Sequence, residues 1–294
     1  MTTCWCARLP PAARQLVAIP LADGSAPEAE LRRSKRATRL SLRLLCDGSL
    51  RLTAPQAMSL RDIELAAHHF APWLEKRLAQ HAASVEERVL PTSLVLPFTG
   101  AEYAITHGGE YAAGRSLASR ARSVVRTSGA QGGQRLLLLE LDSELRCFCT
   151  DGVWQGASAP VEQHPLLQLL VAFCRRQATA LLPPFLNNVA ARHGFIVNDI
   201  RIHDQHSRWA SCARMRTGAG HRINLNWRGV FLTQELFTHL CCHELCHTLH
   251  MDHSARFHAA LEKISPNAKA LERGLNAAWR NLPWWVKLRF PAGN

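Results

Sequence analysis

Three residues in the C-terminal third of the chain have types and a spacing that suit metal-dependent hydrolysis. His243, Glu244 and His247 form the pattern H-E-x-x-H within a stretch of helical periodicity. Residues i and i+4 of a helix lie one turn apart on the same face, so both imidazoles can bind one ion. Glu244 is rotated by about 100° from His243 around the helix axis, which lets its carboxylate reach a water molecule beside the ion. The pattern predicts a metal site with Glu244 as its general base.

A third ligand has to come from outside this helix, because catalytic zinc sites use three protein ligands and keep one position for water. His253 follows His247 by six residues and is the predicted third ligand. The complete spacing, H-E-x-x-H-x5-H, is the ligand spacing of the metzincin pattern. Glu262 or Glu272, on the helices that follow, would replace His253 if it were not a ligand. We therefore predict one zinc ion per chain, bound by His243, His247 and His253.

Two more histidines, His239 and His250, extend the row of His243 and His247 by one turn in each direction. Zinc prefers four ligands, so these residues cannot all bind the ion. We interpret His239 as a residue that packs beside the site or supports its ligands. His250 occupies the position where the metzincin pattern has a turn-forming glycine, so the turn here must form differently. The metal-free alternative is that these histidines cap or pack on an amphipathic helix.

The helix that carries the motif is predicted to begin at Thr233, a good N-cap residue, and to reach about Leu249. Ser254 and Pro266 can start two further helices, which end before Pro283. Upstream of the motif helix, Pro183 and Pro184 are predicted to interrupt a helix, which gives helical segments over 166–182 and 185–192. Two short strands are predicted to follow, over 200–202 and 222–227.

The N-terminal part is predicted to be rich in strands. Residues 39–45 and 49–53 alternate apolar and polar side chains around Asp47-Gly48, which predicts a β-hairpin. Ser59 has the features of a helix N-terminus. Residues 107–134 are rich in Gly, Ser, Ala and Arg and are predicted to form a surface loop or insertion. Further strands are predicted over 94–98, 102–106 and 135–141.

These elements predict an α+β fold, with a hairpin-rich N-terminal part before a zincin-like core in which the H-E-x-x-H helix lies beside a small sheet. The predicted regions are an irregular arm over 1–30, a β-rich region over 31–160, the core over 161–283 and a tail over 284–294. In zincins an edge strand holds the substrate backbone, and residues 223–227 are the candidate strand. Asn226, Trp227 and Arg208 are therefore the candidate substrate-binding residues, although Trp227 could equally belong to the core.

Composition limits the classes of protein to consider. The chain has 294 residues, 35 Lys and Arg against 23 Asp and Glu, and a net charge of +12. No apolar run approaches the roughly 18 residues of a membrane span, and the N-terminus lacks the pattern of a signal peptide. Ten cysteines are too sparse for a disulfide framework in a chain of this length. We expect a cytoplasmic protein with reduced thiols and no membrane contact.

Positive charge is concentrated near the N-terminus. Such a cluster could contact phosphates without reading bases, or it could be a solvated sheet face. Sequence-specific recognition is not expected, because no base-reading motif is present. Six of the twelve residues at 32–43 are basic, namely Arg32, Arg33, Lys35, Arg36, Arg39 and Arg43.

Several segments together resemble the YgjP-like metallopeptidase family, which is related to SprT-type and minigluzincin-type zincins. The resemblance implies that His243, His247 and His253 bind zinc, that Glu244 is the general base, and that proteins or peptides are substrates. The SprT relatives act on proteins attached to DNA. The chain departs from the family pattern at Ala210, where glycine is usual, and in a longer stretch at 107–158. The resembling segments are RSKRA at 33–37, LR at 42–43, SL at 59–60, RWASC at 208–212, INLNWR at 223–228, HELCH at 243–247 and MDHS at 251–254 with Phe257.

Three functions are compatible with these residues. The first is a zinc-dependent peptidase. The second is a metal-dependent hydrolase of phosphoanhydrides, such as those of nucleoside triphosphates, because an activated water can attack either electrophile. No P-loop or acidic two-metal cluster supports this second function. The third is a non-catalytic nucleic-acid-binding module with a structural zinc ion, for which Glu244 would serve no purpose.

Overall fold

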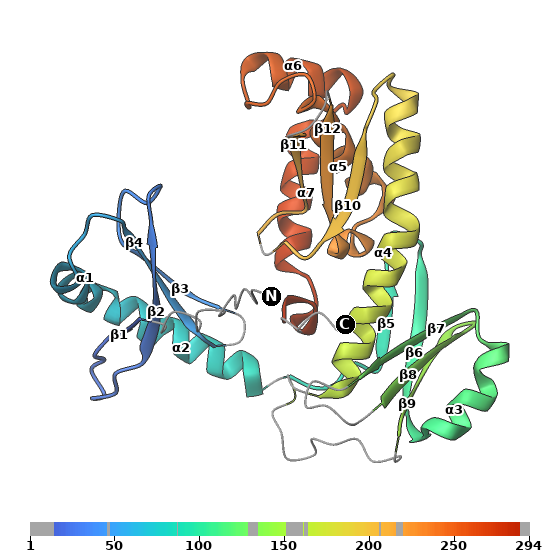
Figure 1. Ribbon diagram of the computed structural model, residues 1–294, viewed down its shortest axis with the longest axis horizontal. Helices are drawn as coiled ribbons and strands as arrows, with labels where there is room; N and C mark the ends of the chain where they lie inside the picture. The colour runs from blue at the N-terminus through green and yellow to red at the C-terminus, as the bar shows by residue number, and fades with distance from the viewer. Residues whose placement is uncertain are drawn as a thin grey trace, which may run out of the picture. The chain divides into compact units, whose positions relative to one another are not determined.

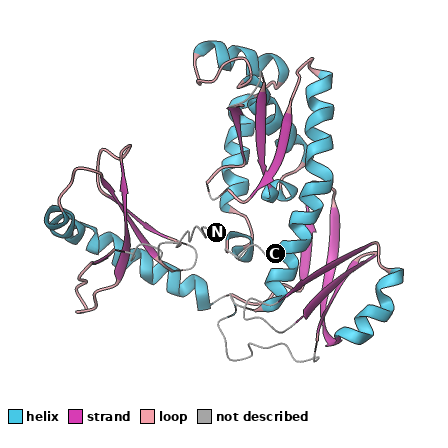
Figure 2. Cartoon of the chain, in the orientation of Figure 1, coloured by secondary structure: helices cyan, strands magenta, loops and turns pink. Residues whose placement is uncertain are grey.

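The computed structural model describes residues 15–45, 48–86, 88–128, 135–150, 161, 164–205, 207–215 and 220–288. The chain forms two compact units, Met1–Arg88 and Val89–Asn294. Both units combine helices with strands (Figure 2), so the α+β prediction is confirmed. The boundary between the two units, at Arg88 and Val89, lies inside the range 31–160, which the sequence analysis treated as one β-rich region. In the described part of the chain, no helix has both the length and the apolarity needed to cross a membrane.

The N-terminal unit contains a four-stranded sheet with the order β1-β2-β4-β3 (Figure 1). The predicted hairpin is confirmed, since β3 and β4 pair antiparallel, although positions 46 and 47 of its turn lie outside the described residues. Two strands begin within the predicted irregular arm, and residues 1–14 of that arm are not described. The first was missed because its three residues bury a single side chain, Val17, too few for a periodic pattern. The strands are β1 Leu16–Ala18, β2 Glu28–Ser34, β3 Ser41–Leu44 and β4 Leu50–Pro55.

One face of this sheet packs against two helices, α1 Leu60–Ala67 and α2 Ala71–Glu86, which are joined by the 3-10 turn His68–Phe70. The predicted helix start is confirmed, because Ser59 is the N-cap and its Oγ accepts a hydrogen bond of 3.1 Å from the Asp62 N–H. The core between the sheet and the helices contains Val17, Ala29, Leu42, Leu50, Leu52, Ala54, Ile63, Ala67 and Leu74.

The second unit begins with a five-stranded sheet of order β5-β6-β9-β8-β7. The prediction of a loop over 107–134 is wrong for most of that range, which contains the end of β6, the helix α3 Tyr111–Leu117 and β7; residues 129–134 are not described. The glycine content misled the prediction because Gly114 allows α3 to pack closely, and a Cβ there would lie 2.6 Å from Phe148 Cδ2. The strands are β5 Ser93–Leu96, β6 Ala101–Glu110, β7 Ser123–Ser128, β8 Arg135–Leu141 and β9 Glu144–Cys149.

A long helix, α4 Pro165–Arg192, runs through the core of the second unit and contacts both of its sheets. The expected interruption at Pro183 and Pro184 does not occur, and both prolines lie inside the helix. Prolines remove two helical hydrogen bonds, but burial of Leu182 and Leu186 on either side keeps the helix continuous. Tertiary packing has therefore overridden local propensity.

The second sheet of this unit has three strands, β10 Asp199–His203, β11 Ala210–Arg214 and β12 His221–Asn226, in the order β10-β12-β11. β12 is the central strand, parallel to β10 and antiparallel to β11. The prediction that residues 223–227 form an edge strand is therefore wrong. β11 forms the edge beside the motif helix, and its Ala-Ser-Cys-Ala-Arg sequence lacks the large apolar residues that would have marked it as a strand.

The helices after the sheet begin close to the predicted positions. Thr233 is the N-cap of α5, with its Oγ1 accepting from the Leu236 N–H at 3.3 Å, and Ser254 is the N-cap of α6. The motif helix is shorter than predicted, because His247 is already its C-cap. The elements are the 3-10 helix η4 Trp227–Phe231, α5 Gln234–Cys246, α6 Ala255–Ile264, α7 Ala268–Arg280 and the 3-10 helix η5 Trp284–Lys287.

Candidate metal centre

Three imidazole rings meet at the C-terminal end of α5. His243 lies in the last turn of the helix, His247 caps it, and His253 returns just before α6. The Nε2 atom of His243 is 3.2 Å from Nε2 of His247 and 3.3 Å from Nε2 of His253. A tetrahedral zinc ion with bonds of about 2.05 Å separates its ligand atoms by about 3.3 Å. The three nitrogens therefore fit a single zinc-sized cation, and all candidate ligand atoms lie within 4.8 Å of one another.

The other ring nitrogens of two histidines have partners that set the ring orientations. His247 Nδ1 lies 3.0 Å from the His250 carbonyl oxygen, which can accept its proton. His243 Nδ1 lies 3.5 Å from Oε1 of Glu272, on α7. Nδ1–H contacts of this kind leave Nε2 with a free lone pair for a metal ion. His250 also closes the turn that follows α5, because its N–H donates to the Cys246 carbonyl at 2.9 Å.

Phe257 of α6 forms the apolar support of the three rings. It is fully buried, and its ring centroid lies 5.0 Å from that of His243, 4.5 Å from His247 and 4.9 Å from His253. A close-packed aromatic residue restricts the rotamers of its neighbours. The convergence of the histidines is therefore held by packing as well as by hydrogen bonds.

The electrostatic environment of His243 and His247 favours their neutral form. Burial, followed by the charges of His247 and His253, lowers the pKa of His243 to about 3. Burial also lowers the pKa of His247. Metal ions bind the neutral imidazole, so both rings are ready to act as ligands at neutral pH without releasing a proton.

Glu244 lies beside the histidines and is 5 % exposed. Burial raises the pKa of its carboxyl group to about 8, although a hydrogen bond from the Cys212 main chain and the charge of Arg208 oppose this shift. Its Oε2 atom is buried and has no hydrogen-bond partner among the described residues. A buried oxygen without a partner requires an explanation, and a water molecule or cation at the histidine cluster would provide one.

An open pocket of about 400 Å³ lies in front of Glu244 and His243. Trp209 and Ala210, at the start of the edge strand β11, form one wall. Apolar and polar side chains of α5, α6 and α7 form the rest. The lining residues are Trp209, Ala210, Leu240, His243, Glu244, His253, His258, Glu272, Leu275 and Asn276.

Comparison with known proteins agrees with this geometry. Residues 148–278 match the family model described as YgjP-like, metallopeptidase domain. This part of the chain is therefore similar to a YgjP-like metallopeptidase domain. The family implies a metal-dependent peptidase that acts on proteins or peptides, and the resemblance inferred from the sequence is confirmed.

A solved structure gives a weaker likeness. It is described as the metallopeptidase zymogen of Pyrococcus abyssi abylysin, and it matches at 22% identity with a TM-score of 0.30. The match covers 34% of this chain and 96% of that chain. No curated protein matches the sequence.

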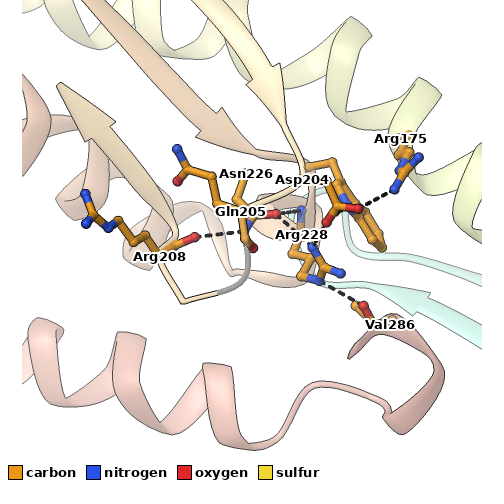
Figure 3. Close-up of polar contacts among 8 residues, drawn as sticks. Arg175, Asp204, Gln205, Arg208, Asn226, Arg228 and Val286 are labelled. Carbon is orange, nitrogen blue, oxygen red and sulfur yellow. Dashed lines mark hydrogen bonds and ion pairs between the residues drawn. The ribbon is translucent and has the colours of Figure 1, made fainter. Parts of the chain in front are cut away.

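None of the three predicted substrate-binding residues is among the residues that line the pocket. Asn226 is fully buried, and its Nδ2 donates to the carbonyl oxygens of Gln205 and Arg208, both at 2.7 Å (Figure 3). Trp227 is 1 % exposed and donates from Nε1 to Asp204 at 3.1 Å. Both residues hold the loop before β11 instead of contacting substrate. The alternation of Asn226 and Trp227 could not reveal this, because the sequence does not show which strand lies at the edge.

Arg208, the third predicted substrate-binding residue, is exposed, and its side chain extends away from Asn226 and Gln205 (Figure 3). Its charge acts on the carboxyl group of Glu244. Because its carbonyl is held by Asn226, its position beside Glu244 depends on the same loop contacts.

A partly buried ion cluster anchors the other end of this loop. Asp204 pairs with Arg228 and Arg175, and Arg228 is 3 % exposed. Nε of Arg228 also donates to the Val286 carbonyl at 2.8 Å (Figure 3). The sequence analysis missed Asp204, because a single aspartate between two strands has no distinguishing pattern. Its partner Arg228 was visible only as the last residue of the INLNWR segment.

The alternative ligands face elsewhere. Oε1 of Glu262 accepts a hydrogen bond of 3.1 Å from the Asn267 N–H. Glu272 lies against the Nδ1 side of His243, on the far side of the ring from Nε2. His239 is buried, with Nδ1 2.8 Å from Ser265 Oγ, which is the packing position expected for it.

Proposed function

We propose that the YgjP-like domain is a zinc-dependent peptidase in which His243, His247 and His253 bind one zinc ion and Glu244 is the general base. The observation that carries this proposal is the meeting of three histidine Nε2 atoms, with that of His243 lying 3.2 and 3.3 Å from the other two, beside the unpartnered Oε2 of Glu244. Three histidine ligands leave one coordination position for water, as catalytic zinc sites require.

In the proposed reaction the zinc ion and Glu244 have separate roles. A zinc ion supplies Lewis acidity, which lowers the pKa of water to about 7 and polarises the scissile carbonyl. The charge of a bound cation would favour the ionised form of Glu244, whose pKa burial otherwise raises. Oε2 of the carboxylate would then accept one proton from the attacking water as the water oxygen forms a bond to the carbonyl carbon. Glu244 then donates this proton to the nitrogen of the leaving amine as the C–N bond breaks. Arg208 does not line the pocket, but its charge acts on Glu244 and favours the ionised carboxylate that a general base needs.

The edge strand β11 is suited to bind the substrate backbone. The Asn226 N–H donates to the Trp209 carbonyl at 2.8 Å, so residues 209, 211 and 213 face β12. In an antiparallel pair the main-chain groups alternate, so those of Ala210 and Cys212 point to the free edge. The Cys212 main chain already contacts Glu244, whereas Ala210 lines the pocket. An extended peptide would therefore pair beside Ala210 and bring its scissile bond to Glu244.

The lining of the pocket favours a peptide over a nucleotide. Its described lining residues include the carboxylates Glu244 and Glu272 and no lysine or arginine. Nucleoside triphosphates are polyanions and require cationic side chains or a second metal ion. A structural zinc module is disfavoured as well, because the site opens into a pocket and keeps a carboxylate beside the open position.

The test compares zinc content and proteolysis in the natural protein and in Glu244→Gln. We expect about one zinc ion per chain in both proteins, and casein cleavage that falls by about 10²–10⁴-fold in the variant. Glu262→Gln is the matched control, because it removes a carboxylate that does not line the pocket, and it should retain activity. Nucleoside triphosphate hydrolysis that requires Glu244, without peptide cleavage, would contradict the proposal in favour of the phosphoanhydride alternative.

A further inference from the structure

The sheet of the N-terminal unit has one face covered by its own helices and one polar face. Leu42, Leu50, Leu52 and Ala54 are buried on the covered face. Their neighbours along β3 and β4 alternate with them and point to the opposite face. We call this second side the outer face. Its residues include Leu16, Glu28, Glu30, Arg32, Ser41, Arg43, Arg51 and Thr53.

Three arginines from three neighbouring strands lie together on the outer face. Arg43 of β3 is directly opposite Arg51 of β4. Arg32 of β2 is opposite Thr53, one step further along the same face, and Thr53 is also opposite Ser41. The arginines thus form a compact group interspersed with two hydroxyl side chains.

This arrangement is unfavourable for the sheet itself. Like charges directly opposite each other on antiparallel strands are destabilising. Two carboxylates of β2, Glu28 and Glu30, lie on the outer face, and Glu30 compensates in part because it lies 3.7 Å from Arg51. Within the described residues, no carboxylate forms an ion pair with Arg32 or Arg43, and both are exposed. An anion lying across the outer face would relieve the repulsion.

The chain between β2 and β3 adds positive charge at the end of this face. Lys35, Arg36 and Arg39 are exposed there. Arg33 does not belong to the group, because its Nη1 donates to the main-chain oxygens of Gln56 and Met58. The structure thus modifies the basic cluster expected from the sequence, since Arg33 leaves the group and Arg51 joins it.

We propose that the outer face binds the phosphodiester backbone of nucleic acid without reading its bases. Guanidinium groups match the geometry of phosphate oxygens, and serine and threonine hydroxyls are common backbone contacts. The outer face has no aromatic residue to stack on bases, which excludes readout by stacking. Its exposed Leu16 lies on the edge strand β1, so the described residues provide no apolar anchor at the centre of the face, which a protein interface or a membrane surface would need.

The experiment uses the full chain and a fluorescein-labelled DNA duplex, with binding followed by anisotropy at increasing salt. The double variant Arg43→Ala/Arg51→Ala should bind at least tenfold more weakly at low salt. The slope of log affinity against log salt should fall by about 1 for each arginine removed. Arg61→Ala is the matched control, because it removes an exposed arginine from α1, and it should bind like the natural protein.

A gain of affinity provides a second test that does not depend on weakening the fold. Glu30→Gln removes the carboxylate beside Arg51 and should tighten DNA binding. His243→Ala, which disables the proposed peptidase site, should leave DNA binding unchanged, so the two proposals fail separately. The proposal is overturned if both arginine substitutions leave the affinity and salt slope unchanged. It is also overturned if polyglutamate or phosphatidylserine vesicles bind the outer face as tightly as DNA does.

Discussion

At the scale of single residues, the histidine cluster depends on contacts made by the nitrogens that do not face the ion. His247 is oriented by a main-chain carbonyl, whereas His243 is oriented by the side chain of Glu272. The carboxylate can be changed without altering the ligand itself. Glu272 therefore offers a direct test of how ring orientation contributes to metal affinity.

We expect Glu272→Gln to weaken zinc binding by about 10–100-fold, the range typical of partners that orient metal ligands. The Gln amide oxygen can still accept from Nδ1, but it lacks the negative charge that strengthens the imidazole as a ligand. Competition with a chromogenic chelator measures the affinity directly. Glu262→Gln, which removes a nearby charge without contacting a ligand ring, should bind zinc normally. Unchanged affinity in Glu272→Gln would show that packing on Phe257 alone orients His243.

At the scale of elements, the loop before β11 connects the partly buried ion cluster to the pocket. At the start of the loop, Asp204 pairs with Arg228. The Asn226 side chain then donates hydrogen bonds to the loop carbonyls of Gln205 and Arg208. Burial raises the pKa of Asp204, but the hydrogen bond and charge of Arg228 and the charge of Arg175 outweigh burial and hold the pKa below its usual value. The carboxylate is therefore a stabilising group whose contribution depends on pH.

We expect Asp204→Asn to lower the free energy of unfolding by about 3 kcal/mol at neutral pH, because the buried Arg228 loses its counter-charge. A depressed folded-state pKa stabilises the fold above the unfolded-state pKa of about 3.9, and this stabilisation is lost as the pH falls through the folded-state value. The difference between the natural protein and the variant should therefore shrink below about pH 4 in urea denaturation. Asp142→Asn, at an exposed ion pair, should differ little from the natural protein at any pH. A difference that does not change with pH would contradict this assignment.

At the scale of the whole molecule, the candidate metal centre draws its residues from several segments of the second unit. The ligands come from the end of α5 and the turn before α6, their supports come from α6 and α7, and the pocket is completed by β11. A metal ion that binds these segments only in the folded state must stabilise this unit.

We expect zinc at about 100 times its dissociation constant to stabilise the fold by about 2.7 kcal/mol. For a unit of this size, that energy corresponds to a rise of about 5–10 °C in the unfolding temperature. Thermal unfolding with zinc and with a chelator measures this shift. His243→Ala should abolish it, whereas the outer-face variant Arg43→Ala should retain it. A shift that persists in His243→Ala would mean that zinc binds elsewhere in the chain.

The sequence alone determined the features that rest on local spacing. H-E-x-x-H places His243 and His247 on one helix face and Glu244 beside them, because the helical repeat relates those positions directly. Thr233 and Ser59 marked helix starts, since their side chains accept from main-chain N–H groups three residues on. Ser254 also marked a helix start, although its side chain makes no capping hydrogen bond. The alternation on both sides of positions 47 and 48 similarly specified the β3–β4 hairpin.

Only the tertiary structure decided which segments meet. It made β12 the central strand and β11 the edge, buried Asn226 and Trp227, and kept α4 continuous through its two prolines. It also brought Glu272 to His243 and paired β2 with β4, which placed Arg32 beside Thr53. These outcomes depend on strand order and on the packing of residues far apart in the chain. The physical reason is that local patterns fix the face of an element on which a side chain lies, while long-range packing determines what that face contacts.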